Sequence, residues 1–361
     1  SLTTATKSTL VGYQAGGGAT MTGNGNTLMG YDAGYAIAGG ADNIAIGRNA
    51  MDAAAACNYN VGVGINALGT ANNGEEFNIA IGYDAMVSVD DTNADHNVVL
   101  GAYAGTGGGG QFARNIAIGS YSLNSTGSSE LTATIAIGYE TGTAINHSDA
   151  SESTLVGHQS GTALTSGQRN TGFGAGTITS ITTGDENTAV GYRAMQNPAG
   201  TTNVLRCVAI GAYALDAAAT HANEVAIGYN ALTNWTGDGS GTDTQGYNIA
   251  IGGNSMLNQT SGARNIAIGY DALNDMNHED NAEAYNVGIG HDAGRCITTG
   301  KQHVFIGALC GADSSKTLTG DGNTAVGYRA AHAHTADADL NSCFGWKAGD
   351  AIQEADKNTV I

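Results

Sequence analysis

The feature that most constrains this chain is a short motif, Asn-Ile-Ala-Ile-Gly-Tyr-Asp-Ala-Leu in its fullest form, that occurs 19 times within 361 residues. Its central glycines recur every 17 to 24 residues, at Gly12, Gly30, Gly47, Gly64, Gly82, Gly101, Gly119, Gly138, Gly157, Gly174, Gly191, Gly211, Gly228, Gly252, Gly269, Gly290, Gly307, Gly327 and Gly345. Self-similarity at a short period indicates a solenoid, in which each repeat packs on its neighbours. The sequence therefore predicts an all-β fold: a parallel β-solenoid or β-roll of about 19 coils, forming a single repeat domain over residues 1–361.

The residue four before each glycine, which we call the Asn slot, opens a short strand. It is asparagine in 13 of the 19 copies and Ser8, Thr134, Ser153, Cys207, Glu224 or His303 in the others. An asparagine that recurs once per coil can stack as a hydrogen-bonded ladder, or it can close the turn into the strand. The residues chosen as ladder candidates are Asn43, Asn78, Asn115, Asn187, Asn265 and Asn323.

Two further positions exchange volume. The middle slot, two residues before the glycine, is large in six copies, and in all six the residue four after the glycine (the +4 slot) is glycine. In ten of the 13 copies with Ala or Gly in the middle slot, the +4 slot is Leu, Met or Ile; the exceptions are Gly142, Gly294 and Ala331. Compensation of this kind is expected of two residues that share one layer of core. We therefore expect the two slots to face each other inside the coil.

The residues on either side of the middle slot, the flanking slots, are mostly Ile, Val, Leu or Thr. If the middle slot points inward, the flanking slots point outward, and they form an apolar stripe that needs a cover. The simplest cover is an identical chain, which predicts a homotrimer first and a homodimer second.

The slot directly after the glycine (the +1 slot) carries eight of the 15 tyrosines and Trp346. One interpretation is an aromatic ladder that packs coil on coil; the alternative is a track on which sugar rings stack. The surface-contact candidates are Tyr83, Tyr192, Tyr229, Tyr270, Tyr328 and Trp346.

The composition of the chain excludes some classes of binding partner. A net charge of −19 argues against nucleic acid and against an anionic membrane surface, since both require Lys and Arg. The sequence contains no stretch of 18 apolar residues, so we expect no insertion into a membrane. The five cysteines have no metal-like spacing, and free thiols favour assembly in a reducing cytoplasm.

These residues resemble two groups of fibrous proteins. The Asn-x-Ala-Ile-Gly strand is similar to the head repeats of trimeric autotransporter adhesins, which form left-handed parallel β-rolls. The longer form, such as 191–195 with the linker 183–187, looks more like repeats of phage tail-fibre proteins. The resemblance covers essentially the whole chain and implies trimers, although the period here exceeds that of the usual adhesin head repeat. It concerns scaffold residues and implies no activity.

No arrangement of residues predicts catalysis, a phosphate loop or a cofactor site, so we expect a non-enzyme. The acidic stretches 90–95 and 238–243 lack the full spacing of a calcium loop, and solvated turns are the simpler interpretation. His332 and His334 form the one candidate site for a transition metal, since a trimer would present six imidazoles, but the pair lies in a linker.

The favoured function is a structural and adhesive fibre: the shaft or head of a phage tail fibre or similar virion appendage that contacts a glycan or protein on the host surface. A bacterial trimeric adhesin head, located at the cell surface, is the alternative in the same class. The non-catalytic part of a polysaccharide-degrading tailspike is the alternative of another class. An ice-binding solenoid is disfavoured because regular Thr-x-Thr ranks are missing.

Overall fold

The chain is an all-β parallel β-solenoid, as predicted. The computed structural model describes residues 5–71, 74–89, 91–107, 110–125, 127, 130–147, 150–196, 204–217, 221–235, 246–278, 283–311, 317–333, 338–350, 352 and 356–361. Within these residues no α-helix occurs, and the strands pair in parallel. The chain divides into two compact units, Ser1–Thr183 and Gly184–Ile361, each built of the same coil. That the whole chain acts as a single domain stays a prediction.

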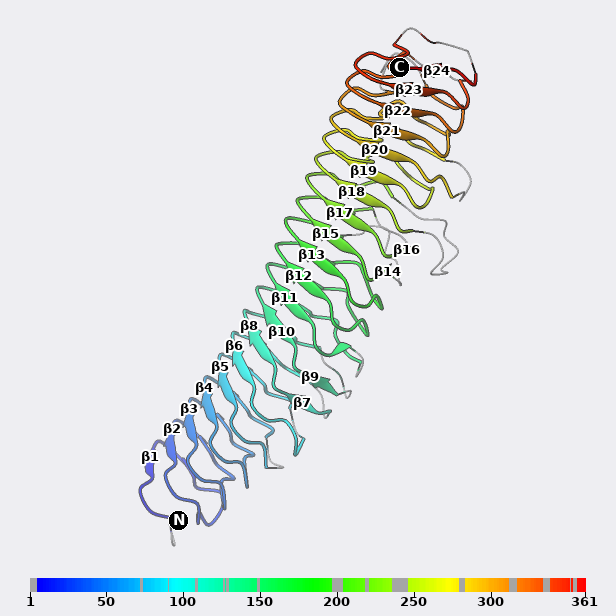
Figure 1. The fold of residues 1–361 in the computed structure, drawn as a ribbon. Helices are drawn as coiled ribbons and strands as arrows, with labels where there is room; N and C mark the ends of the chain where they lie inside the picture. Colours follow the sequence, from blue (N-terminus) through cyan, green and yellow to red (C-terminus); the bar gives the residue numbers. More distant parts are fainter. Residues whose placement is uncertain are drawn as a thin grey trace. The chain divides into compact units, whose positions relative to one another are not determined.

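In the first unit, one short strand per coil pairs with the strand of the next coil (Figure 1). The strands of this ladder are β1 (Thr9–Val11), β2 (Thr27–Met29), β3 (Ile44–Ile46), β4 (Val61–Val63), β5 (Ile79–Ile81), β6 (Val98–Leu100), β8 (Ile116–Ile118), β10 (Ile135–Ile137), β11 (Thr154–Val156) and β12 (Thr171–Phe173). A second pair, β7 (Phe112–Ala113) with β9 (Leu131–Thr132), lies on the stretch that leads into the main strands.

The second unit repeats this arrangement. Its ladder consists of β13 (Thr188–Val190), β15 (Val208–Ile210), β17 (Val225–Ile227), β18 (Ile249–Ile251), β19 (Ile266–Ile268), β20 (Val287–Ile289), β21 (Val304–Ile306), β22 (Thr324–Val326), β23 (Ser342–Phe344) and β24 (Thr359–Val360). The additional pair is β14 (Val204–Leu205) with β16 (His221–Ala222). In both units like slots pair with like slots, for example Ala226 with Ala250.

The strands are three residues long because left-handed backbone bounds them on both sides. In the coil of β3, φ is +57° at Asp42, +134° at Gly47, +56° at Asn49 and +52° at Met51. The same four positions have positive φ in all 19 copies. Left-handed residues cannot continue a strand, so they turn the chain at fixed points of every coil.

The central glycine is required by a close approach as well as by φ. A Cβ atom built on Gly47 would lie 2.4 Å from the carbonyl oxygen of Gly64 in the next coil. Most central glycines meet the next one in this way, and Gly345, whose nearest neighbours would be 4.0 Å away, is an exception. Stacking at this spacing therefore excludes any side chain from the glycine column.

The predicted volume exchange is present in the core. A Cβ on Gly161 would lie 2.7 Å from Leu155 Cδ1, and one on Gly311 would lie 2.4 Å from Phe305 Cε2, so the +4 slot faces the middle slot of its own coil. At the exception Gly142 the space is filled instead by Leu123 of the preceding coil, 3.0 Å away, and by Ile145, 3.1 Å away.

Left-handed φ explains why glycine appears at the +4 slot whenever volume allows it. Leu273, with φ of +49°, and Ile178, with φ of +53°, adopt a conformation that costs about 1–2 kcal/mol for a residue with a Cβ. Both side chains are fully buried. Filling the core beside a small middle residue offsets that strain, because a buried aliphatic side chain contributes about 1.5–3 kcal/mol.

Candidate functional site

The Asn slot forms a buried hydrogen-bonded column. Asn78 Oδ1 accepts the backbone N–H of Asn97 in the next coil at 3.0 Å and its side-chain amide at 2.9 Å. Asn78 Nδ2 donates to the carbonyl of Ala94, at the far end of its own coil, at 2.7 Å. One amide therefore joins successive coils and also closes its own coil.

The six ladder candidates share this environment: Asn43, Asn78, Asn115, Asn187, Asn265 and Asn323 are all fully buried. Each one accepts the backbone N–H of the next residue in the column at 2.9–3.0 Å. Because buried amides need partners, the column stabilises the stack of coils and is not a surface for ligands.

Several residues that replace asparagine preserve the same bond by different chemistry. Ser153 Oγ accepts the N–H of Asn170 at 3.2 Å, and His303 Nδ1 accepts that of Asn323 at 3.2 Å. Glu224 Oε2 accepts the N–H of Asn248 at 2.9 Å. Burial holds the pKa of Glu224 well above its ordinary value. These three residues therefore supply a side-chain acceptor of suitable reach, which sequence comparison alone did not reveal. Thr134 is an exception, since its hydroxyl donates to the Thr132 carbonyl at 3.4 Å.

The flanking slots leave an apolar stripe on the surface of each unit, as expected. In β5 the middle residue Ala80 is fully buried, whereas Ile79 and Ile81 are 38% and 41% exposed. Other exposed members are Val11, Met29, Ile44 and Phe173 in the first unit, and Ile210, Ile268, Ile306 and Phe344 in the second. A continuous row of half-exposed aliphatic and aromatic side chains is typical of an interface.

Aromatic rings of the +1 and +2 slots form columns along the coils. In the first unit Tyr83, Tyr103, Tyr121, Tyr139 and His158 follow one another at centroid distances of 5.1–6.1 Å. Tyr103 and Tyr121 are stacked, with an interplanar angle of 11°, so their faces cover each other. Tyr83 and Tyr103, and Tyr121 and Tyr139, meet edge to face, at 68° and 82°. Coil-on-coil packing therefore accounts for this column, and sugar stacking on it stays a prediction.

The surface-contact candidates are all half-exposed or more. Their exposed fractions are 42% for Tyr83, 47% for Tyr192, 57% for Tyr229, 52% for Tyr270, 45% for Tyr328 and 71% for Trp346. The ring centroids of Tyr192 and Tyr213 lie 5.5 Å apart, and those of Tyr270 and His291 lie 5.6 Å apart. Contact with another molecule stays a prediction for these rings.

A second exposed column, immediately before the Asn slot, was not recognised in the sequence. Tyr59, Phe77 and His96 stack at 4.9 and 5.0 Å in the first unit. In the second unit, Arg264 lies between the rings of Tyr247 and Tyr285, at 5.6 and 5.7 Å. Residue identity varies at this slot, so the repeat shows no aromatic pattern there; the shared feature is positive φ.

The candidate metal site is only partly described. His332 Nδ1 lies 3.5 Å from Arg329 Nη2 and 3.7 Å from Asp350 Oδ1, and the side chain is 19% exposed. His334 lies outside the described residues. Within the described part of the chain, no group of three His, Cys, Asp or Glu residues is placed to hold a metal ion. Metal binding by the pair stays a prediction.

The described part of the acidic stretch 90–95 forms a turn and a hydrogen bond to the preceding coil. Asp91 Oδ1 accepts the N–H of Asn93 at 2.8 Å, and Asp95 Oδ1 accepts the N–H of Glu76 at 2.7 Å. Asp90 and the stretch 238–243 lie outside the described residues. The recurring aspartates after the glycine are also engaged: Arg295 lies 3.7 Å from Asp292 and 4.0 Å from Asp271.

All five cysteines are buried and none forms a disulfide bond: Cys57, Cys207, Cys296, Cys310 and Cys343. Burial raises the pKa of Cys57 and of Cys310 to about 12. Since the thiolate is the reactive form, burial disfavours reaction at Cys57 and Cys310.

Among the described residues, no helix has the length and apolar character needed to cross a membrane. Comparison of the chain with family models, with curated proteins and with solved structures finds no match.

Proposed function

We propose that this chain is a structural and adhesive fibre protein: a homotrimeric shaft or head of a phage tail fibre, or of a similar virion appendage, that contacts a host surface. The observation that carries the proposal is the apolar stripe of flanking residues, which runs along β-strands whose other face is the filled coil interior. A solenoid without a cover over this stripe would expose it to water in every coil. The repeat's resemblance to fibrous trimers supports three copies, and a dimer would cover the same stripe.

Light scattering coupled to size exclusion tests the assembly directly. We expect a particle mass three times the 36.2 kDa of the chain. The double substitution Ile79→Asp, Ile81→Asp introduces two charges into the stripe of β5 and should shift the particle toward monomer. Ser125→Asp, at an exposed position outside the stripe, serves as the control and should leave the mass unchanged. A wild-type protein that stays monomeric at micromolar concentration would remove the proposal.

We further propose that the fibre is not an enzyme. The aspartates of the +2 slot (Asp32, Asp84, Asp271 and Asp292) supply the most regular carboxylate row, and three of them contact neighbouring polar side chains: Asp84 accepts from Asn66 at 2.8 Å, and Arg295 lies near Asp271 and Asp292. A retaining or inverting glycosidase needs two carboxyl groups that face one substrate bond. Incubation with capsular polysaccharide should release no reducing ends; release above a heat-inactivated control would support the tailspike alternative.

The alternative in the same class is a bacterial adhesin located at the cell surface. Free thiols led us to expect assembly in a reducing compartment, but burial protects these five thiols from oxidants in any compartment. Attachment should therefore be measured with phage-sensitive and phage-resistant bacterial cells. Selective binding of the purified fibre to sensitive cells supports a virion role, whereas equal binding to both argues against it.

A further inference from the structure

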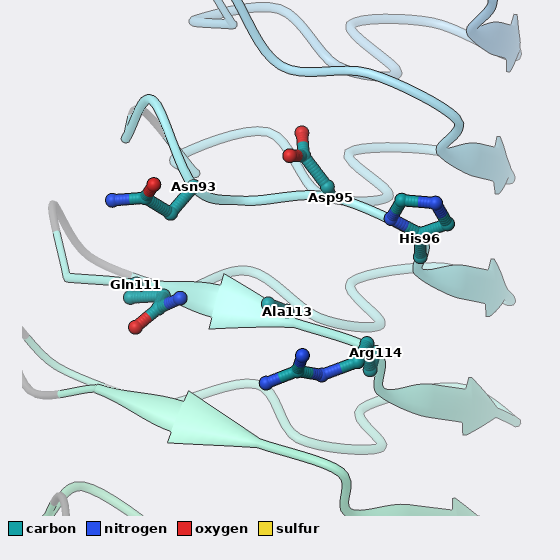
Figure 2. A pocket seen from close by; sticks show the side chains of 6 residues that line it. All are labelled: Asn93, Asp95, His96, Gln111, Ala113 and Arg114. Atoms are coloured by element: carbon teal, nitrogen blue, oxygen red, sulfur yellow. The ribbon is translucent and has the colours of Figure 1, made fainter.

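A polar pocket of about 260 Å³ opens on the first unit, beside the stretches that lead into β6 and β8. Asn93, Asp95 and His96 line it from one coil. Gln111, Ala113 and Arg114 line it from the equivalent positions of the next coil. Figure 2 shows Ala113 at the centre with the other five side chains around it.

The pocket exists because Ala113 is short. Strand β7 alternates, so Phe112 points into the core, where it is 1% exposed, and Ala113 points outward. The preceding and following coils have Asp95 and Thr132 at the position of Ala113. Ala113 is nevertheless only 5% exposed, because it forms the floor between longer neighbours.

Backbone pairing and side-chain contacts fix the walls. Asp95 Oδ1 accepts the N–H of Glu76 at 2.7 Å, and the Arg114 N–H donates to the Asp95 carbonyl at 2.8 Å. The His96 ring stacks on Phe77 at 5.0 Å. The side chains of Asp95 and His96, which are held in this way, lose little freedom when a ligand binds, which favours affinity.

The lining favours a neutral ligand with several hydroxyl groups. The carboxylate of Asp95 and the guanidinium of Arg114 carry opposite charges, and the amides of Asn93 and Gln111 each donate and accept. A hydroxyl group also donates and accepts, so a ring with neighbouring hydroxyls can satisfy this mixed set. An anion would meet both Asp95 and a chain of net charge −19, and an apolar molecule would leave the polar groups without partners.

Size and surroundings point the same way. The volume lies just below the usual range of ligand pockets, which begins at about 300 Å³, and suits one sugar ring. The exposed column of Phe77 and Tyr59, 47% and 50% exposed, continues from His96 along the preceding coils. Its apolar ring edges lie where the C–H groups of an adjoining sugar would extend.

We propose that this pocket binds one neutral hexopyranose residue of a host surface glycan, with Asp95 and Arg114 hydrogen-bonding to neighbouring hydroxyls and with the amides completing the set. The proposal rests on the attachment function proposed above and gives that function a ligand class and a location.

Ligand-observed NMR with methyl glucoside, galactoside and mannoside tests the site, with methyl glucuronide as the charged comparison. The full-length wild-type protein should bind at least one neutral hexoside. Ala113→Thr fills the floor with a residue that the next coil already has at this position, so the fold should tolerate it while binding is lost. Arg114→Gln should weaken binding about tenfold, as expected for loss of a hydrogen bond to a charged group. The control is Arg169→Gln, an exposed arginine at the same position of another coil in this unit, and it should bind as wild type.

Three results would overturn the proposal: no hexoside bound by wild type, binding of the glucuronide alone, or binding unchanged in both Ala113→Thr and Arg114→Gln. A protein that attaches to cells but binds no hexoside contradicts the pocket while leaving the attachment function standing. Hexoside binding that depends on Ala113 and Arg114, in a protein that fails to attach to cells, supports the pocket and contradicts the attachment function.

Discussion

The asparagine column is regular in one stretch of the first unit and mixed in a stretch of the second, and the difference separates what the fold needs from what the repeat prefers. In the first unit six asparagines follow without interruption, from Asn26 to Asn115, with Ser8 before them and Thr134 and Ser153 after them. In the second, Cys207 and Glu224 stand between Asn187 and Asn248, and His303 replaces a further asparagine. Yet the Asn248 N–H is still accepted by Glu224, and the Asn323 N–H by His303. Where Glu224 and His303 replace asparagine, the acceptor for the next coil is kept, whereas the amide donor that closes the coil is not.

Removal of the acceptor from the regular column should have the largest effect. Asn78→Ala leaves the Asn97 N–H and the Ala94 carbonyl without their partners in a buried site, which should cost about 3–5 kcal/mol of unfolding free energy. Asn78→Ser, which imitates Ser153, keeps an acceptor and should cost about half as much. Urea unfolding at one fixed protein concentration measures both. Equal losses for Ala and Ser would show that the acceptor is not the deciding group.

In the mixed stretch of the second unit, replacement of the Glu224 carboxyl group should increase the stability of the protein. Glu224 is fully buried and its pKa is raised by burial, so the folded protein retains a proton that the unfolded chain loses above a pH of about 4.5. Stability should therefore fall as pH rises from about 4.5 toward the folded-state pKa. Glu224→Gln keeps the acceptor and removes this loss, and we expect a gain of about 1 kcal/mol or more at pH 7.

Thermal unfolding of wild type and Glu224→Gln at pH 4 and pH 7 tests that expectation. The two proteins should unfold at similar temperatures at pH 4, where both states of the wild type are protonated. If Glu224→Gln stabilises the protein equally at the two pH values, the gain comes from the shape of the glutamine side chain and not from the ionisation of Glu224.

The smallest effect is expected for His303→Asn. The Nδ1 atom of His303 already acts as the acceptor, and its ring stacks on Phe305 at 5.1 Å. His303→Asn restores the amide but loses this stacking, so the unfolding free energy should change by less than about 1 kcal/mol. His303→Leu removes the acceptor and should cost about 2 kcal/mol. If chemical denaturation finds the Asn and Leu variants equally stable, the acceptor rule does not extend to this coil.

Much of the fold could be predicted because the 19 copies serve as comparisons within one chain. The exchange between Leu155 and Gly161, repeated in other copies, indicated a shared layer of core, and the flanking Ile79 and Ile81 indicated an outward face. The acceptor rule could not be predicted, because Ser, Cys, Glu and His share little beyond a lone pair.

The pocket could not be predicted for another reason. Asn93 and Gln111 both lie eight residues before their central glycines, so their equivalence can be read from the sequence. That these linker positions of two coils line one pocket follows only from the folded backbone. In the sequence, Asp95 read only as part of an acidic turn. Conversely, His332 and His334 stood out as a pattern, although the structure engages His332 with Arg329 and Asp350.

The column of central glycines also limits how the gene that encodes this repeat protein can change in length. Because a Cβ on Gly47 would lie 2.4 Å from the carbonyl oxygen of Gly64, every coil must present the same bare backbone to the next. Unequal recombination between two copies of the repeat joins one glycine-bearing strand to another and so preserves that contact. Deletion of a few nucleotide triplets inside a strand would instead move a side chain into the column. Duplication and loss of whole coils are thus the changes in length that the fold tolerates best, and the variable linkers can diverge between them.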